Sequence, residues 1–226
     1  MRTVSFQSVL HGVAARCGLD GVADGLSATD ARGYAEYINT AAKYAWEYYP
    51  WPEVLQVEAR TPVEGVIAWE PGFGTIIQVT KRHPFSSSNP QPLKWRIGPA
   101  GVYLLEAREA YVWVVWRAPA PVFGADPHNT GKTYAAGSVV FRAQDGECYE
   151  ATEATSTAPP GAAWAKVPML RILSEAIKAG AYSLTLQEEG QHSTSLLPAD
   201  SMESLLEHEV DLIERQSGQS QTFRLP

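Results

Sequence analysis

Cysteine and long apolar runs are both scarce in this sequence. Its 226 residues include two cysteines, Cys17 and Cys148, whereas a secreted framework held together by disulfides needs several pairs. A single disulfide between these two stays open. The first twenty residues are too polar for a secretory signal, and no apolar run is long enough to cross a membrane. We therefore expect a protein that is made in a cytoplasm and has no membrane partner.

Positive charge is also in short supply. The chain carries 18 Lys and Arg against 25 Asp and Glu, which gives a formal net charge of -7 and a pI near 5.3. A protein that binds nucleic acid tightly needs clustered Lys and Arg to pair with phosphates, so the charge balance argues against such binding. DNA can still slide past such a surface. The hydrophobic fraction of 45% and the charged fraction of 19% are typical of a folded protein.

Catalytic and metal-binding arrangements are missing as well. The segment GADPHNTGKT ends like a phosphate-binding loop, but Asp126 replaces the required first glycine, and a strand pattern follows where a helix is needed. None of the five histidines has a second His or Cys at metal-ligand spacing. Four acidic residues crowd one predicted hairpin turn instead of forming a glycosidase pair: Asp145, Glu147, Glu150 and Glu153. We expect no enzyme activity, no metal and no cofactor.

Helical periodicity marks both ends of the chain. Apolar residues recur at helical spacing over residues 6–17, and a Ser27/Asp30 cap predicts a second helix that runs to about residue 49. The pattern returns at residue 169. We expect the last helix to open at Pro198, which suits the first turn of a helix.

The middle of the chain is predicted to be β structure. Short runs of β-branched and aromatic residues alternate with turns over residues 54–118, and a Pro/Gly-rich linker leads to a small β module. The run YVWVVWRA, residues 111–118, is apolar on both faces and is therefore expected at the centre of a sheet or at a contact between the sheet and the body. Most of the seven tryptophans are expected in the core or at subunit contacts.

These patterns predict an α+β fold, in which a helical bundle is formed by the N- and C-terminal helices and is interrupted by an antiparallel β region and a small β module. The expected segments are the N-terminal helices (1–52), the inserted β region (53–118), the small β module (119–168), the C-terminal helices (169–216) and an extended C-terminal arm (217–226). The sequence indicates that the module is a peripheral addition to the helical bundle. Deleting residues 122–167 is therefore expected to leave the helices folded.

The small module resembles a known carbohydrate-binding frame. Tyr134, Gly137, Tyr149 and Trp164 are spaced as in small chitin- and cellulose-binding modules, and the match covers residues 131–167. In that family, aromatic residues just after a Tyr-x-Ala element present flat faces to the glycan. This chain has Glu153 and Ala154 there, so the resemblance implies how the module folds and not what it binds.

A second resemblance concerns the layout of the whole chain. The segment ARGYAEYINTAAKYAWEYYPWPEV is similar to an early helix of tailed-bacteriophage head-to-tail adaptor proteins, also called connector or neck proteins. The segment that follows Lys178 resembles their terminal pair of helices with a polar C-terminal arm. Adaptors of short-tailed phages also carry a β insertion between such helices.

The adaptor resemblance implies a structural protein of the virion neck, assembled in the host cytoplasm. It implies a self-assembled ring, twelve-fold in that family, that docks below the portal protein, continues the DNA channel and meets a downstream tail or neck protein. DNA would pass without specific binding.

Two groups of residues then become candidates for function. Acidic residues of the last helix are expected to face either the channel or solvent: Glu203, Glu207, Glu209, Asp211 and Glu214. The C-terminal residues Phe223, Arg224 and Leu225 are expected to form an arm that contacts a neighbouring subunit or the portal, with a frayed terminus as the alternative.

Two other functions stay open. One is a different neck or tail-completion protein. The other is a carbohydrate-binding or adhesion protein that uses residues 131–167. A glycan binder must bring two or more exposed aromatic rings into one plane, so the exposure of the module's aromatic residues distinguishes these classes.

Overall fold

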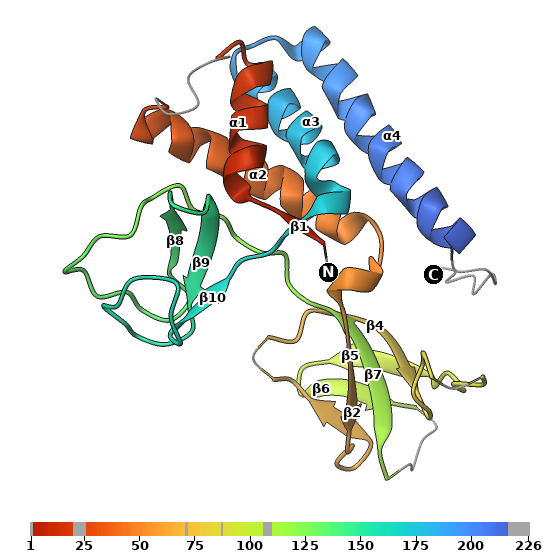
Figure 1. Ribbon diagram of the computed structural model, residues 1–226. Helices are drawn as coiled ribbons and strands as arrows, with labels where there is room; N and C mark the ends of the chain where they lie inside the picture. The colour runs from red at the N-terminus through yellow and green to blue at the C-terminus, as the bar shows by residue number, and fades with distance from the viewer. Residues whose placement is uncertain (1, 20–25, 71, 87, 106–109, 217–226) are drawn as a thin grey trace. The chain divides into compact units, whose positions relative to one another are not determined.

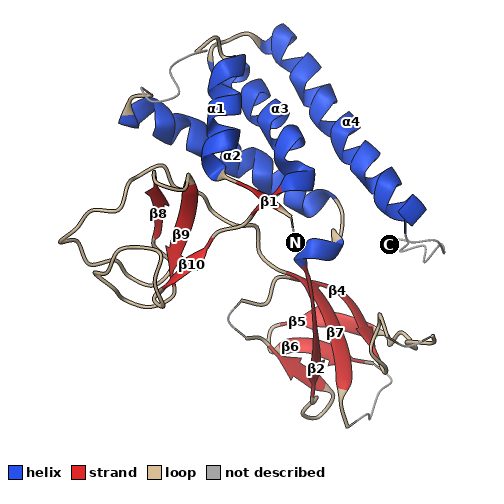
Figure 2. Cartoon of the chain, in the orientation of Figure 1, coloured by secondary structure: helices blue, strands red, loops and turns tan. Residues whose placement is uncertain are grey.

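The computed structural model describes residues 2–19, 26–70, 72–86, 88–105 and 110–216. Over these residues the protein is mixed α+β, with four α-helices and several antiparallel sheets, as Figures 1 and 2 show. The predicted α+β class is confirmed. The chain divides into two compact units. We call Met1–Tyr49 with Pro121–Pro226 the helical unit, and Pro50–Ala120 the β unit.

The first two helices start at serine caps. Helix α1 (Phe6–Arg16) begins after Ser5, whose Oγ accepts a hydrogen bond from the Ser8 amide at 3.2 Å. Helix α2 (Ala28–Tyr48) begins after Ser27, whose Oγ accepts from the Asp30 amide at 3.1 Å. Each serine satisfies an amide that the first helical turn leaves without a partner. The predicted Ser27/Asp30 cap is confirmed.

The last two helices form a hairpin. Helix α3 (Arg171–Glu188) and helix α4 (His192–Gln216) are joined at Gly190, which has a φ of 77°. The Gln191 amide closes this turn by donating to the Leu186 carbonyl at 2.8 Å. Helix α3 contacts all three other helices (Figure 1), and its buried residues accordingly lie on more than one side of it.

The prediction that the last helix opens at Pro198 is wrong, because α4 begins at His192 and Pro198 lies inside it. An internal proline removes one backbone hydrogen bond and costs roughly 3 kcal/mol in an isolated helix. Packing against α3 outweighs that cost. Ser195, one turn before the proline, is buried, and its carbonyl accepts a hydrogen bond from Ser183 Oγ of α3 at 2.8 Å.

A two-stranded sheet ties the start of the chain to the start of α3. Strand β1 (Thr3–Val4) pairs antiparallel with β11 (Met169–Leu170), with Thr3 opposite Leu170. Because β1 leads directly into α1 and β11 into α3, this pairing holds the starts of these two helices together.

The small module consists of β8 (Val139–Arg142), β9 (Glu147–Ala151) and β10 (Trp164–Lys166), in the order β10-β9-β8. The predicted hairpin turn is confirmed, with Gly146 at a φ of 71° between β8 and β9. The module belongs to the helical unit and not to a unit of its own.

The β unit contains two three-stranded antiparallel sheets. The first has β7 (Val112–Arg117) between β2 (Leu55–Arg60) and β4 (Thr75–Thr80), which confirms the predicted central strand. The second has β6 (Gly101–Leu104) between β3 (Val66–Ala68) and β5 (Trp95–Gly98). A 3-10 turn, η1 (Pro52–Val54), leads into β2. One core cluster is shared by both sheets: Ile67, Ile76, Val79, Val102, Val112 and Val114.

Candidate interaction surfaces

The framework residues predicted for the module form its core. Tyr134, Tyr149 and Trp164 belong to one buried cluster, each exposing 7% or less of its surface. The rings of Tyr134 and Trp164 meet edge to face with centroids 5.5 Å apart. Gly137 has a φ of 83°, which suits glycine, and its amide donates to the Ala151 carbonyl at 2.8 Å. The four residues hold the module together.

The same burial leaves the module without a platform for sugars. Within residues 119–168, all of which the structure describes, the one exposed large apolar side chain is that of Val122. A flat glycan-binding face needs exposed rings, and here the rings of Tyr134 and Trp164 pack against each other and against His128.

A cleft of about 540 Å³ lies beside the module's first loop. Its lining includes Arg32 from α2 and residues of the segment that resembles a phosphate loop. Arg32 Nε pairs with Asp126 Oδ1 at 2.5 Å, and the Lys132 ammonium lies 5.2 Å from the centre of the Tyr134 ring. The two cationic side chains on this cleft are therefore engaged by the protein itself.

An aromatic joint attaches the module to the helices, which the sequence pattern did not predict. Phe6 of α1 is 1% exposed, stacks on Phe123 at a centroid distance of 5.5 Å, and meets Phe141 of β8 edge to face at 6.0 Å. Asn39 of α2 bonds both backbone groups of Phe123. Its Nδ2 donates to the Phe123 carbonyl at 2.8 Å, and its Oδ1 accepts from the Phe123 amide at 2.7 Å.

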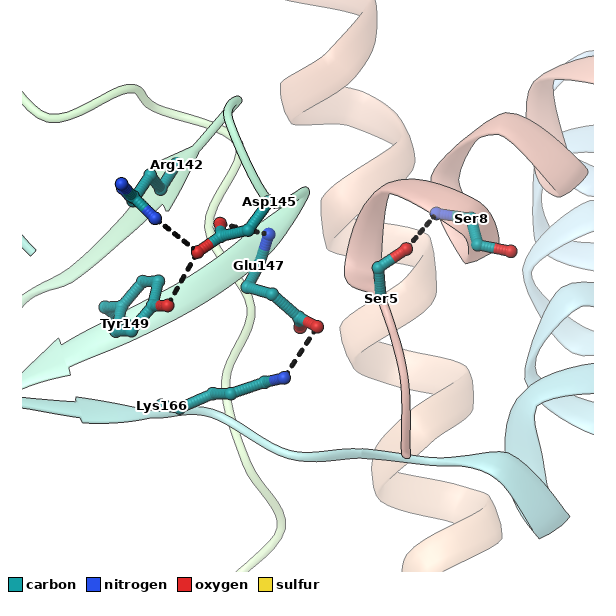
Figure 3. Close-up of polar contacts among 7 residues, drawn as sticks. All are labelled: Ser5, Ser8, Arg142, Asp145, Glu147, Tyr149 and Lys166. Atoms are coloured by element: carbon teal, nitrogen blue, oxygen red, sulfur yellow. Dashed lines mark hydrogen bonds and ion pairs between the residues drawn. The ribbon is translucent and has the colours of Figure 1, made fainter. Parts of the chain in front are cut away.

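The acidic hairpin beside this joint is a network of ion pairs (Figure 3). Asp145 Oδ2 accepts from Arg142 Nη1 at 2.6 Å and from Tyr149 Oη at 2.8 Å. Burial disfavours the charged carboxylate, but these hydrogen bonds outweigh it and hold the pKa of Asp145 below its usual value. Glu147 Oε1 pairs with Lys166 Nζ at 2.7 Å. Asp145 and Glu147 thus fix the hairpin, whereas Glu150 and Glu153 are exposed.

Both cysteines are free thiols. Cys148 is fully buried, and burial raises the pKa of its thiol to about 12. Burial also raises the pKa of the Cys17 thiol. Neither thiol is therefore activated as a nucleophile, and the disulfide that the sequence left open does not form.

An acidic stripe runs along α4. We give this name to five exposed carboxylates that recur every three or four residues: Asp200, Glu203, Glu207, Asp211 and Glu214. At 100° per residue, this spacing places them on one face of the helix. The predicted Glu209 stands off that face and is half-buried. The helix carries six acidic residues against one arginine.

Tyrosines of α2 line this stripe. Tyr44 Oη donates to Glu203 Oε1 at 3.1 Å, and the rings of Tyr44 and Tyr48 lie 6.0 Å apart. Burial, the hydrogen bond to Glu203 and the nearby negative charge raise the pKa of Tyr44. Burial and the charges of Glu207 and Glu203 raise that of Tyr48. Glu203 and Glu207 of the stripe therefore interact with the tyrosine side chains of α2 as well as with solvent.

The β unit has the opposite charge balance. Residues 50–120 contain seven Lys and Arg against six Asp and Glu. The rest of the chain contains 11 Lys and Arg against 19 Asp and Glu. Residues 71–105 contain no acidic residue at all. This signal was present in the sequence, but a count over the whole chain hides it.

Some predictions fall where the structure gives no test. Phe223, Arg224 and Leu225 lie outside the described residues. Among the described residues, no helix is both long and apolar enough to span a membrane, and no cluster of three metal-ligating side chains forms.

Neither a protein-family model nor a curated protein matches this chain.

Proposed function

We propose that this protein is a structural component of a phage neck, a head-to-tail adaptor whose copies form a ring below the portal and continue the DNA channel toward the tail. The observation that carries the proposal is the separation of unlike charge onto two units, with the acidic stripe on the helical unit and the acid-free segment on the β unit.

Unlike surfaces are what a ring requires. In a ring, each subunit contacts its neighbours through two different patches, one complementary to the other. A chain that carries an acidic surface on one unit and a more basic surface on the other supplies both patches. A monomeric enzyme or a glycan-binding module has no need of this division.

The helical unit fits the role of the ring's body. We infer that α1 to α4 form the helical bundle, because α3 packs against the other three helices and β1, which leads into α1, pairs with β11, which leads into α3. The net charge of -7 per copy would be multiplied around a ring. Such a ring repels the DNA backbone and lets it pass.

The test is electron microscopy of the protein mixed with its cognate portal, with each component alone as control. We expect a ring of density below the portal that neither component shows by itself. Retention of the chain on chitin or cellulose, without portal binding, would overturn the proposal in favour of the carbohydrate-binding alternative. Binding to a tail protein but not to the portal would favour a different neck protein.

A further inference from the structure

A cleft of about 250 Å³ is lined by the first turns of α2 and the last turn of α3, both in the helical unit. Helix α2 contributes residues at intervals of three or four, which places them on one face of the helix: Asp30, Gly33, Tyr34 and Tyr37. Glu188 and Glu189 come from the end of α3. We call this site the acidic cleft, after its three carboxylates.

The negative charge of the acidic cleft is not balanced by a cation of the cleft itself. Asp30 Oδ2 accepts a hydrogen bond from Ser27 Oγ at 2.7 Å, and Glu189 Oε2 accepts from Gln191 Nε2 at 3.2 Å. Both donors are neutral. In the part of the chain that the structure describes, no lysine or arginine belongs to the lining.

Carboxylates beside tyrosine rings suit a guanidinium group. Burial, the Cys17 thiol and the charges of Asp30 and Glu189 raise the pKa of Tyr34 to about 12, so its ring stays uncharged at neutral pH. An arginine can donate hydrogen bonds to a carboxylate and lay its flat face on an aromatic ring. Gly33 keeps the site open, because a Cβ there would meet no other atom within 4 Å. The acidic cleft therefore fits an arginine side chain.

The chain carries such an arginine beyond α4. Residues 217–226, which lie outside the described residues, contain Arg224 between Phe223 and Leu225 and have no Asp or Glu. We call this segment the arm. It follows directly on the end of α4 at Gln216, and its charge is complementary to that of the acidic cleft.

The arm is too short to reach the cleft of its own copy. Helices α3 and α4 form a hairpin (Figure 1), in which Ser183 of α3 bonds Ser195 near the start of α4. The cleft lies further toward the end of α3, so the helix from Ser195 to Gln216 separates it from the arm by about 32 Å or more. The eight residues from Gln216 to Arg224 span at most about 29 Å when fully extended.

We propose that Arg224 of one copy enters the acidic cleft of the next copy in the ring. The inference rests on the proposed function, and it gives the arm a receiving site that the sequence did not indicate. A second copy is the favoured occupant because each chain carries both an arm and a cleft that its own arm does not reach. The contact can therefore repeat head to tail until a ring closes.

Charge-reversed full-length chains test this contact on the portal. The first variant carries Arg224→Glu, and the second carries Glu188→Arg with Glu189→Arg. Each variant alone sets like charges against each other. We therefore expect the concentration for half-maximal ring formation, measured by electron microscopy, to rise about tenfold.

Restoring opposite charges should restore the ring. A chain that carries all three substitutions pairs a reversed arm with a reversed cleft. An equal mixture of the two variants does the same when the variants alternate around the ring. We expect both samples to form rings at about the concentration that the unmodified chain requires.

Filling the cleft without changing its charge is an independent test. Gly33→Leu places a side chain in the open space beside the two tyrosine rings. Leucine favours a helix more than glycine does, so α2 should remain folded. We expect the concentration for half-maximal ring formation to rise about tenfold here too.

Matched controls reverse exposed charges elsewhere. Arg215→Glu changes the last cation before the arm, and Glu150→Arg with Glu153→Arg changes two carboxylates of the module. Both should form rings at the concentration of the unmodified chain. Circular dichroism checks the folding of every variant. If the reversal at the cleft unfolds the chain, Glu188→Gln with Glu189→Gln replaces it, with a smaller rise expected in the same direction.

Four outcomes contradict the proposal in different ways. If Arg224→Glu leaves ring formation unchanged, the arm makes no contact in the ring, while the adaptor function stands. If Arg224→Glu weakens the ring but the cleft substitutions neither weaken nor rescue it, the arm binds the portal instead. If the chain with all three substitutions forms rings but the mixture does not, each arm occupies its own cleft. If even the unmodified chain adds no ring to the portal, the proposed function fails and this contact fails with it.

Discussion

Asn39 is a polar residue of α2, and its neighbours in the helix are largely small or apolar. Both the nitrogen and the oxygen of its side-chain amide form hydrogen bonds. It bonds the carbonyl and the amide of Phe123, which lies 84 residues further along the chain. A side chain that satisfies both backbone groups of one residue acts as a substitute for a strand partner. The sequence shows the asparagine, but not that a loop so far away returns to it.

Replacing Asn39 with alanine leaves both backbone groups of Phe123 without partners. We expect the free energy of unfolding of the helical unit to fall by about 1–3 kcal/mol, as for unsatisfied buried groups. The Phe123 amide should exchange its hydrogen faster, which mass spectrometry of the deuterated protein measures. Thr40→Ala, at the next and exposed position, is the control. Unchanged exchange at Phe123 would show that the pair contributes nothing.

Asp145 gives a prediction about pH. Because the pKa of its carboxyl is lowered in the folded protein, its stabilising effect is fully present above the ordinary value of about 4 and is lost as pH falls through the lower, folded value. Asp145→Asn should therefore lower the melting temperature at pH 7, and the difference should shrink below pH 4. Tyr149→Phe removes one donor and should give a smaller effect with the same pH trend. A difference that stays constant down to pH 3 would contradict this.

At the scale of elements, the module and the helices depend on each other. The module reads in sequence as a decoration that can be removed, but Phe6 and Asn39 of the helices complete their contacts with Phe123 and Phe141. Deleting residues 122–167 uncovers those contacts. We therefore expect the deletion to destabilise α1 and α2, which is the reverse of the expectation from sequence.

The substitution Phe6→Ala tests this dependence without a deletion. Truncating a buried aromatic side chain costs roughly 3–5 kcal/mol, so we expect a large drop in the melting temperature of the helical unit. Val122→Ala, at an exposed apolar site next to Phe123, should change it little. The measurement is thermal unfolding followed by circular dichroism at 222 nm. Equal effects from both substitutions would mean that the aromatic joint is not the link.

Sequence patterns predicted elements better than their contacts. The central position of β7, the Ser27 cap and the hairpin at Gly146 each follow from residues within one short segment. The start of α4 did not, because packing against α3 overrides the proline rule at Pro198. The sequence named acidic residues of the last helix as candidates, but it omitted Asp200, and it included Glu209, which stands off the stripe.

At the scale of the whole molecule, the β unit is an insertion whose two ends lie together. Strand β2 leaves and strand β7 returns side by side, with Leu55 opposite Arg117, and the Ala118 amide donates to the Val54 carbonyl at 3.1 Å. Replacing residues 55–117 with a short Gly/Ser linker therefore closes a small gap, which is tolerated at low cost. We expect the shortened chain to keep its helical signal.

The measurement is circular dichroism of the shortened chain, together with portal binding. Retained helices with loss of the ring are expected, since the β unit with its acid-free segment is removed while the acidic stripe remains. Loss of the helical signal would mean that the two units do not fold independently, and retention of the ring would exclude the β unit from the subunit contact.

The pairing of β1 with β11 also sets the order in which the chain can mature during synthesis. Thr3 and Val4 are synthesised more than 160 residues before their partners, Leu170 and Met169. Phe6 likewise packs against Phe123 and Phe141, which are synthesised much later. The β unit holds all its strand partners within residues 55–117. Because synthesis proceeds at about 5–20 residues per second, the inserted unit has seconds in which to fold while the first helix of its host still lacks most of its core.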